Sequence, residues 1–315
     1  MAFLLTLGCW GRADDNQGNA EADQGVSVEE VVQRLSQVEA KLHGLRVHCD
    51  STSKFRTQGI DGQQLRLPGA VAGPGGARTD IAGVWHYQDD GSWCFDGDMS
   101  SAAASEATPP SYLQQLLFSV YDGPRGRGKY ILLNAPDSEF RNTKEKEVFV
   151  STPGRLQFQT QPLEFLTHNG GISIRDELLQ KEAKVTGRDL LNGRTVVVLA
   201  TKVWETRFNP QLYREFWFDW ERSVVVRRQT FTRLSQNQPW RLLHRRDCQG
   251  FERDSVTQLW LPQSAKEFIW TVDEQGQIVL ARMEAFVFND WQINPDFDRA
   301  LFSIDRGLRP GLTDS

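Results

Sequence analysis

Residues 213–220, with the sequence Tyr-Arg-Glu-Phe-Trp-Phe-Asp-Trp, decide the fold class of this chain. On a β-strand Phe216 and Phe218 share one face and Trp217 lies on the other, because successive side chains alternate. Residues 278–291 repeat this arrangement, with large apolar side chains on both faces. A sheet with one solvated face alternates cleanly between apolar and polar residues. We therefore expect a sheet that is covered on both sides, with helices and in part a ligand over its concave side.

Alternating patterns of this kind recur along most of the chain and predict about a dozen strands. Turn signals such as Asn192-Gly193 join neighbouring strands, so we expect one extended antiparallel sheet. Because strand twist accumulates across a sheet of this size, the sheet should curl into a trough. The strands are expected near residues 45–56, 80–88, 92–97, 112–122, 129–134, 146–151, 183–190, 194–204, 213–219, 223–233, 241–250, 256–272 and 277–291, with short helical pieces over 162–182 and loops at 67–78 and 99–111.

One clear helix precedes the strands. Ser27 and Glu30 have the spacing of a capping box, and apolar residues from Val28 to Leu42 recur at steps of three and four. The apolar stripe of this helix, expected over about 27–43, needs an apolar surface to lie on. We predict a mainly β fold with few helices (α+β), in which a curved antiparallel sheet forms an incomplete β-barrel packed around the N-terminal amphipathic helix. Residues 27–315 are expected to form this single half-barrel domain.

The first 26 residues are interpreted as the remnant of an export signal followed by a disordered N-terminus. The apolar core from Ala2 to Leu7 is short and has no basic residue before it, yet its position is typical of a signal peptide. Cleavage after Ala13 and lipidation of Cys9 are two alternative processing routes, and a disordered cytosolic N-terminus is the third alternative. We expect an exported protein of the periplasm or cell envelope, with peripheral or lipid-anchored membrane contact if Cys9 is lipidated.

Composition argues against a nucleic-acid partner. The chain has 315 residues, 36 Lys and Arg against 41 Asp and Glu, and a formal net charge of −5. Such a balance gives no overall attraction to phosphate backbones. The adjacent arginines 227–228 and 245–246 point to opposite faces of a strand, so each pair supplies one outward charge and one that can rim the concave face. Solubilising arginines on the outer face are the favoured interpretation.

The sequence lacks the common catalytic, phosphate-binding and zinc-binding motifs. Residues 123–129 have the spacing GxxxxGK, but the β-like residues after Lys129 predict a hairpin where a phosphate-binding loop needs a helix. No HExxH or GxSxG motif is present, and no zinc-binding cysteine pair. Cys49, Cys94 and Cys248 allow one disulfide with three pairings, although buried free thiols are favoured. We expect no metal, no cofactor and no enzymatic activity; a carbohydrate-active enzyme is the weakest alternative.

Five short phrases in the C-terminal third carry a family resemblance. They are Phe-Trp-Phe-Asp at 216–219, Trp-Leu-Pro at 260–262, Ile-Asn-Pro at 293–295, Leu-Phe-Ser-Ile at 301–304 and Pro-Gly-Leu-Thr-Asp at 310–314. In this order the chain resembles the LolA/LolB/RseB-like superfamily of outer-membrane lipoprotein-sorting-type proteins, in its divergent planctomycete-type form. The resemblance implies a strongly curved, incomplete barrel whose hydrophobic concavity is plugged by helices.

Two hypotheses for function follow from this resemblance. The first is a non-enzymatic envelope protein that binds a lipid or a lipoprotein acyl chain on the concave face. The second is an envelope sensor or interaction module that binds a protein partner, with its cavity filled by its own helix. An inner surface lined with polar groups would contradict the first hypothesis. Because the sequence does not say which face is concave, the expected ligand-binding aromatics come from both faces: Trp85, Phe216, Trp217, Phe218, Trp270, Phe286 and Phe288.

Overall fold

The computed structural model describes residues 25–55, 77–103, 113–122, 127–134, 160–169, 171–205, 211–233, 235–272 and 278–303. Twelve strands in these residues form one antiparallel sheet in the order β5-β4-β3-β2-β1-β16-β15-β12-β11-β10-β9-β8. They are β1 (Gly44–Phe55), β2 (Ala77–Gln88), β3 (Trp93–Ala103), β4 (Leu113–Asp122), β5 (Arg127–Asn134), β8 (Lys184–Leu191), β9 (Arg194–Ala200), β10 (Gln211–Asp219), β11 (Val224–Arg233), β12 (Arg241–Gln249), β15 (Ser264–Val272) and β16 (Ile278–Ile293).

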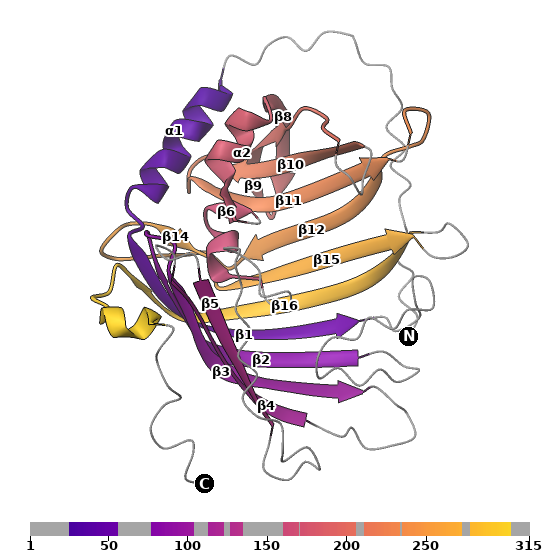
Figure 1. Cartoon of the computed structure of the whole chain (residues 1–315). Coiled ribbons are helices and arrows are strands. Elements are labelled where there is room, and N and C mark those ends of the chain that lie inside the picture. The colour runs from indigo at the N-terminus through magenta and orange to yellow at the C-terminus, as the bar shows by residue number, and fades with distance from the viewer. Residues whose placement is uncertain are drawn as a thin grey trace.

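The sheet is curved but does not close into a barrel, because β5 and β8 are its two ends in the described residues (Figure 1). The first strand and the last strand, β1 and β16, pair in the middle of the sheet, with Cys49 opposite Phe288 and Ser51 opposite Phe286. This pairing joins two meanders, β1 to β5 and β8 to β16, into one trough. The predicted fold class is thereby confirmed.

The N-terminal helix α1 (Val28–Glu39) begins as its sequence predicts. The side chain of Ser27 accepts from the backbone N–H of Glu30, and the Glu30 carboxylate accepts from the N–H of Ser27. Val31 and Leu35 are its buried residues, and they pack against helix α2 (Ile174–Gln180) and against apolar side chains of β9, β10 and β11. The apolar stripe of α1 therefore covers one end of the trough.

The hairpin turns also follow their sequence signals. Asn192 and Gly193 have φ values of 52° and 76° in the turn between β8 and β9, the left-handed backbone that this pair of residues tolerates. Residues 127–134 form β5, antiparallel to β4, so the hairpin interpretation of the GxxxxGK spacing is confirmed. Cys49, Cys94 and Cys248 are free and buried, as favoured.

The structure differs from several predicted bounds. α1 ends at Glu39 and not near residue 43, β9 ends at Ala200 and not near residue 204, and β2 and β3 extend into the loops expected at 67–78 and 99–111.

Two further segments differ in the elements themselves. The strand expected over 256–272 is divided, because Pro262 has no N–H to donate and lies between the two-residue β14 (Trp260–Leu261) and β15. β14 pairs with β13 (Glu252–Arg253). Over 162–182 a 3-10 turn η1 (Pro162–Phe165) and the short hairpin of β6 (His168–Asn169) and β7 (Ile172–Ser173) precede α2. The strand expected at 146–151, Cys9 and Ala13 lie outside the described residues.

A second 3-10 turn, η2 (Arg299–Phe302), follows β16 and packs Phe302 against Cys94 and Val120. Phe302 is buried in a small cluster that is separate from the apolar side chains under η1. Within the described part of the chain, no helix has the length and hydropathy needed to cross a membrane.

Candidate functional site

The inner face of the sheet, defined by Phe216, Arg246, Glu267 and Phe286, carries an aromatic wall at one end. Register places these four residues and Phe288 on the same face, since cross-strand partners in a sheet share a face. Phe286 and Phe288 stack with their centroids 6.1 Å apart, and on β2 and β3 the rings of Trp85 and Phe95 are 4.9 Å apart. All four side chains are buried. The wall provides a continuous apolar surface.

Two glycines shape the part of the wall that β2 and β3 form. Gly83 and Gly97 are directly opposite one another, and the Phe95 ring lies over both of them. A Cβ atom at Gly83 would lie 2.6 Å from the tip of this ring and 2.6 Å from the Cα of Gly97. The absence of side chains at both positions therefore gives Phe95 the room to lie flat against the sheet.

The aromatic wall is roofed by the covering segment, residues 160–180, which contains η1, β6, β7 and α2. The ring of Phe165 lies 4.7 Å from that of Phe286 and 5.1 Å from that of Phe288. Ser173 caps α2 by accepting from the N–H of Asp176 at 3.0 Å, and this cap fixes the turn that brings the helix back over the sheet. Every element of this segment is short, between two and seven residues long.

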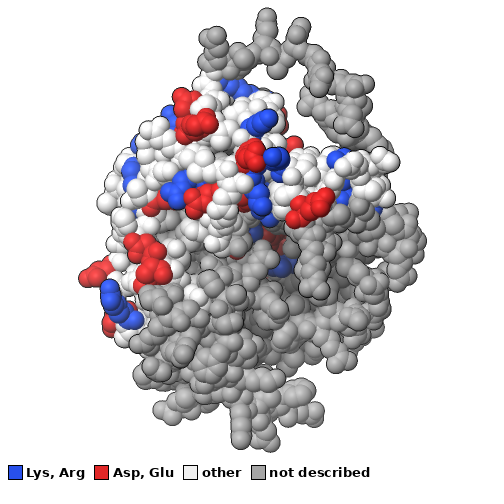
Figure 2. All heavy atoms as spheres, turned by 45° about the horizontal axis from the view of Figure 1, so that its top comes forward, with Lys and Arg blue, Asp and Glu red and all other residues white. Residues whose placement is uncertain are grey.

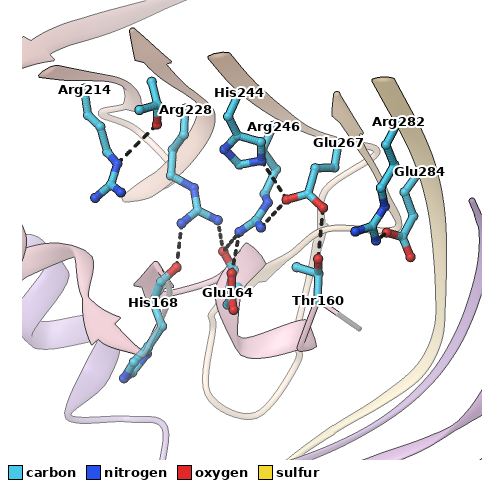
Figure 3. A network of polar contacts seen from close by, with 11 residues as sticks. Thr160, Glu164, His168, Arg214, Arg228, His244, Arg246, Glu267, Arg282 and Glu284 are labelled. Carbon is cyan, nitrogen blue, oxygen red and sulfur yellow. Dashed lines mark hydrogen bonds and ion pairs between the residues drawn. The ribbon is translucent and has the colours of Figure 1, made fainter. Parts of the chain in front are cut away.

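A charged row crosses the inner face at mid-length, one residue on each of five neighbouring strands (Figure 3). Its members are Arg214 on β10, Arg228 on β11, Arg246 on β12, Glu267 on β15 and Glu284 on β16. Four of them are at most 5% exposed. The expectation of an apolar inner surface is therefore wrong at this level of the trough, although it holds for the aromatic wall beside it.

Arg246 is the centre of the row's hydrogen bonds. Its guanidinium contacts Glu267 at 2.5 Å and the Glu164 carboxylate of the covering segment at 3.0 Å. His244 contacts the same Glu267 at 2.7 Å, and Thr160 donates to the other oxygen of that carboxylate at 3.0 Å. Burial alone would raise the pKa of Glu267, but the charge of Arg246 and the bond from His244 hold it well below its usual value. Glu267 is therefore an ionised partner of Arg246.

Arg228 differs from its neighbour in having only neutral acceptors. It donates to the carbonyl oxygen of His168 at 2.6 Å and to that of Glu164, and among the described residues no ion pair joins it to a carboxylate. Burial and the nearby charge of Arg246 lower the pKa of Arg228 to about 9, so it is still a cation at neutral pH. Arg214, next in the row, pairs with Glu177 of α2.

The adjacent arginines alternate between the faces as predicted, but the favoured outward role is wrong for two of them. Arg227 and Arg245 lie on the outer face, where they bind Asp247 at 2.6 and 2.7 Å. Arg228 and Arg246 are buried on the inner face. The alternation that strand geometry imposes was the signal for this arrangement.

The seven predicted aromatics divide between the two faces. Trp85, Phe216, Phe218, Phe286 and Phe288 lie on the inner face. Trp217 packs in an outer cluster with Val224 and donates to Asp189 at 3.3 Å, and Trp270 stacks on the outer-face residue Phe268. Their part in ligand binding stays a prediction. No local pattern marks Phe165 or Glu164 as site residues, because only the tertiary fold brings the covering segment over the sheet.

A pocket of about 400 Å³ lies where the covering segment meets the ends of α1 and β2. Polar groups dominate its lining: Glu39, Tyr87, Asp89, His168, Arg175 and Asp176. Arg175 bridges Glu39 at 3.0 Å and Asp176 at 2.9 Å. Burial raises the pKa of Glu39 and lowers that of His168. This pocket is unsuited to an apolar chain.

The face of the molecule in Figure 2 shows no concentration of one charge in its described part. In Figure 2, basic and acidic residues are interspersed over the described part of the face in view. No group of three or more His, Cys, Asp or Glu side chains in the described ranges has the arrangement needed to hold a metal ion.

Comparison with known proteins gives distant structural likenesses. No protein-family model and no curated protein matches the sequence. The chain is similar to a DUF1329 family protein from Desulfovibrio piger, with a TM-score of 0.43 and 11% identity over 88% of this chain and 96% of that one. A putative outer membrane lipoprotein-sorting protein domain from Vibrio parahaemolyticus has a TM-score of 0.43 and 9% identity, over 87% of this chain and 97% of that one. A chain of the MucA/MucB complex of Pseudomonas aeruginosa has a TM-score of 0.24 and 10% identity, over 83% of this chain and 93% of that one. These likenesses are distant, since every identity is 11% or lower and every TM-score is below 0.5.

Proposed function

We propose that this chain is a non-enzymatic binding protein of the cell envelope, which holds a hydrophobic ligand on its inner face once the covering segment moves aside. The observation that carries this proposal is the aromatic wall of Trp85, Phe95, Phe286 and Phe288, roofed at Phe165 by a segment of short elements. A lipid or lipoprotein acyl chain is the class of ligand that this wall suits. The signal-like N-terminus supports the envelope location.

The energetics favour an exchange between the segment and a ligand. Burying one methylene contributes about 0.8 kcal/mol, so a ten-carbon chain gains about 8 kcal/mol before the cost of displacing the segment. The elements of the segment are short, since η1 has four residues and β6 and β7 have two each, and the segment is held by buried side chains such as Leu163, Phe165 and Leu178. Its opening therefore costs the free energy of these tertiary contacts, which ligand burial has to offset. Ligand binding and segment opening are therefore coupled.

The polar groups of the inner face support a binding role over a catalytic one. Glu267, the carboxylate nearest to a histidine, is held ionised by Arg246 and contacts His244. A general acid needs a raised carboxyl pKa, and here the shift has the opposite direction. Arg214 and Arg246 of the row form ion pairs with the covering segment, and Arg228 donates to its carbonyl oxygens.

Ligand binding is tested with the delipidated full chain and a fluorescent fatty acyl probe. We expect saturable binding, and we expect Phe286→Ala to weaken it by about tenfold or more because a wall ring is lost. Val287→Ala is the matched control, since Val287 is the next residue on β16 and is exposed on the outer face. The absence of saturable binding, together with the absence of lipid in organic extracts of the native protein, would overturn the proposal.

A second candidate, an interaction module with a permanently filled trough, is favoured by the buried ion pairs that hold the segment. Arg246 with Glu164 and Arg214 with Glu177 both join the sheet to the segment. In this case the partner is another envelope protein. Hydrogen exchange separates the two candidates: ligand should speed exchange of amides 162–180 in a ligand-binding protein. If those amides stay protected and a stoichiometric protein partner is recovered without lipid, the second candidate replaces the first.

A further inference from the structure

We propose that Arg228 and Arg246 form the seat for the anionic head group, a carboxylate or phosphate, of an amphiphilic ligand whose tail lies on the aromatic wall. This inference rests on the proposed function and names its ligand class. The two arginines are directly opposite in register on β11 and β12 and are 5% and 3% exposed. Like charges in this arrangement repel one another, so the pair needs anionic partners.

The unequal partners of the two arginines point to a missing anion. Arg246 forms ion pairs with two carboxylates, Glu164 and Glu267, whereas the acceptors of Arg228 among the described residues are the carbonyl oxygens of Glu164 and His168, and carboxylates act on it only through longer-range attraction. A buried guanidinium without a carboxylate keeps most of its desolvation cost. Hydrogen bonds to an anionic oxygen are roughly twice as strong as those to a neutral one, and carboxylate and phosphate groups match the guanidinium fork. An anion at this position would therefore bind Arg228 better than the segment does.

Opening of the covering segment makes the site more positive. Glu164 and Glu177 belong to the segment, so both carboxylates leave the row with it. The described part of the row, with Arg282 beside it, then contains four arginines of the sheet, at positions 214, 228, 246 and 282, and two carboxylates, Glu267 and Glu284. The open trough thus gains an excess of positive charge at its mid-length, and a neutral hydrocarbon ligand leaves this excess uncompensated.

The head-group seat and the apolar wall are adjacent, as an amphiphile requires. The ring of Phe165 contacts both of them, since its centroid lies 4.8 Å from the Arg246 guanidinium and 4.7 Å from the centroid of the Phe286 ring. When the segment moves, one continuous space links the arginines to Phe286 and Phe288. A single molecule with an anionic head and an apolar tail fits this arrangement, in which a charged surface lies beside an apolar one.

The test compares decanoate with 1-decanol, which has the same tail and a neutral head, by calorimetry on the delipidated full chain at pH 7.5. We expect decanoate to bind about tenfold or more tighter, the gain of charge-assisted hydrogen bonds. Arg228→Gln should bring the affinities for decanoate and decanol to the same value, so that the preference for the anionic head group is lost whatever the change in segment opening. Arg227→Gln, at the neighbouring outer-face position, should leave both affinities unchanged.

Each outcome separates this inference from the proposed function. Equal affinities for decanoate and decanol in the wild-type chain overturn the head-group seat and keep the hydrophobic site. Binding of neither overturns the proposed function itself. Inorganic phosphate that binds as tightly as decanoate identifies a free anion as the ligand and overturns the amphiphile. If Arg228→Gln fails to fold, the comparison of the two probes on the wild-type chain still decides.

Discussion

At the residue scale, the inner face shows how a β-sheet tolerates buried charge. Arg228 and Arg246 are opposite one another, and their repulsion is offset by acceptors that come from the covering segment and from β15. Neither arginine is solvated, so each contact has to be made by the protein itself. The segment and the charged row are therefore mutually dependent, and removing either one leaves buried charges without partners.

This dependence predicts loss of stability in acid. The pKa of Glu267 in the folded protein is well below its usual value, so its contribution to stability is complete above about pH 4.5 and is lost as the pH falls further. Burial also lowers the pKa values of His168 and His244 below 6.5, and protonating these buried histidines opposes folding as the pH falls below that value. These three groups act in the same direction. Burial raises the pKa values of Glu39 and Glu215, which act in the opposite direction, but the shift of Glu267 is large, so we expect the free energy of unfolding to fall from pH 7.5 to pH 4.

Urea unfolding followed by tryptophan fluorescence at several pH values measures this effect. Glu267→Gln should cost about 3–5 kcal/mol at pH 7.5, because it leaves Arg246 with one fewer charged partner in a buried site. The variant should also lose less stability than the wild type between pH 5 and pH 4. Glu29→Gln, an exposed position on α1, should behave as the wild type. A variant with an unchanged pH profile would contradict the assigned role of Glu267.

At the element scale, the paired glycines of β2 and β3 set the shape of the aromatic wall. Gly83→Ala should destabilise the protein by about 1–3 kcal/mol or more, because the new Cβ would lie 2.6 Å from both the Phe95 ring and the Gly97 backbone. Ala82→Ser, at the neighbouring exposed position, is the control. Thermal unfolding of both variants checks the prediction, and equal melting temperatures would show that the sheet relaxes around the added methyl group.

Local patterns predicted most of these elements, and non-local contacts explain what they missed. The capping box of Ser27 and the Asn192-Gly193 turn act within a few residues, so the helix and the hairpin were predictable. The pairing of β1 with β16 joins residues more than 200 positions apart, and no local pattern encodes it. For the same reason alternation placed Arg228 and Arg246 on one face, while their acceptors in the covering segment could not be foreseen.

At the scale of the whole molecule, the trough exists because β1 and β16 close two meanders into one sheet. In chain order the covering segment lies between β5 and β8, and these two strands are the ends of the sheet. The segment thus belongs to neither meander. It can therefore open without breaking a strand pairing of the large sheet. A ligand that competes with the segment has an apparent dissociation constant equal to its intrinsic value divided by the fraction of open molecules.

This competition predicts opposite effects of one substitution on stability and on binding. Phe165→Ala removes the ring that seats the segment on Phe286 and Phe288, and such truncations of buried phenylalanine cost about 3–5 kcal/mol. Because the loss falls on the closed state, the open fraction rises, and we expect the fatty acyl probe to bind about tenfold or more tighter although the melting temperature falls. Phe302→Ala, which truncates a buried phenylalanine in the separate cluster under η2, should lower the melting temperature without strengthening binding. Weaker binding by the Phe165 variant would mean that the ring belongs to the ligand site itself and that the segment does not compete with the ligand.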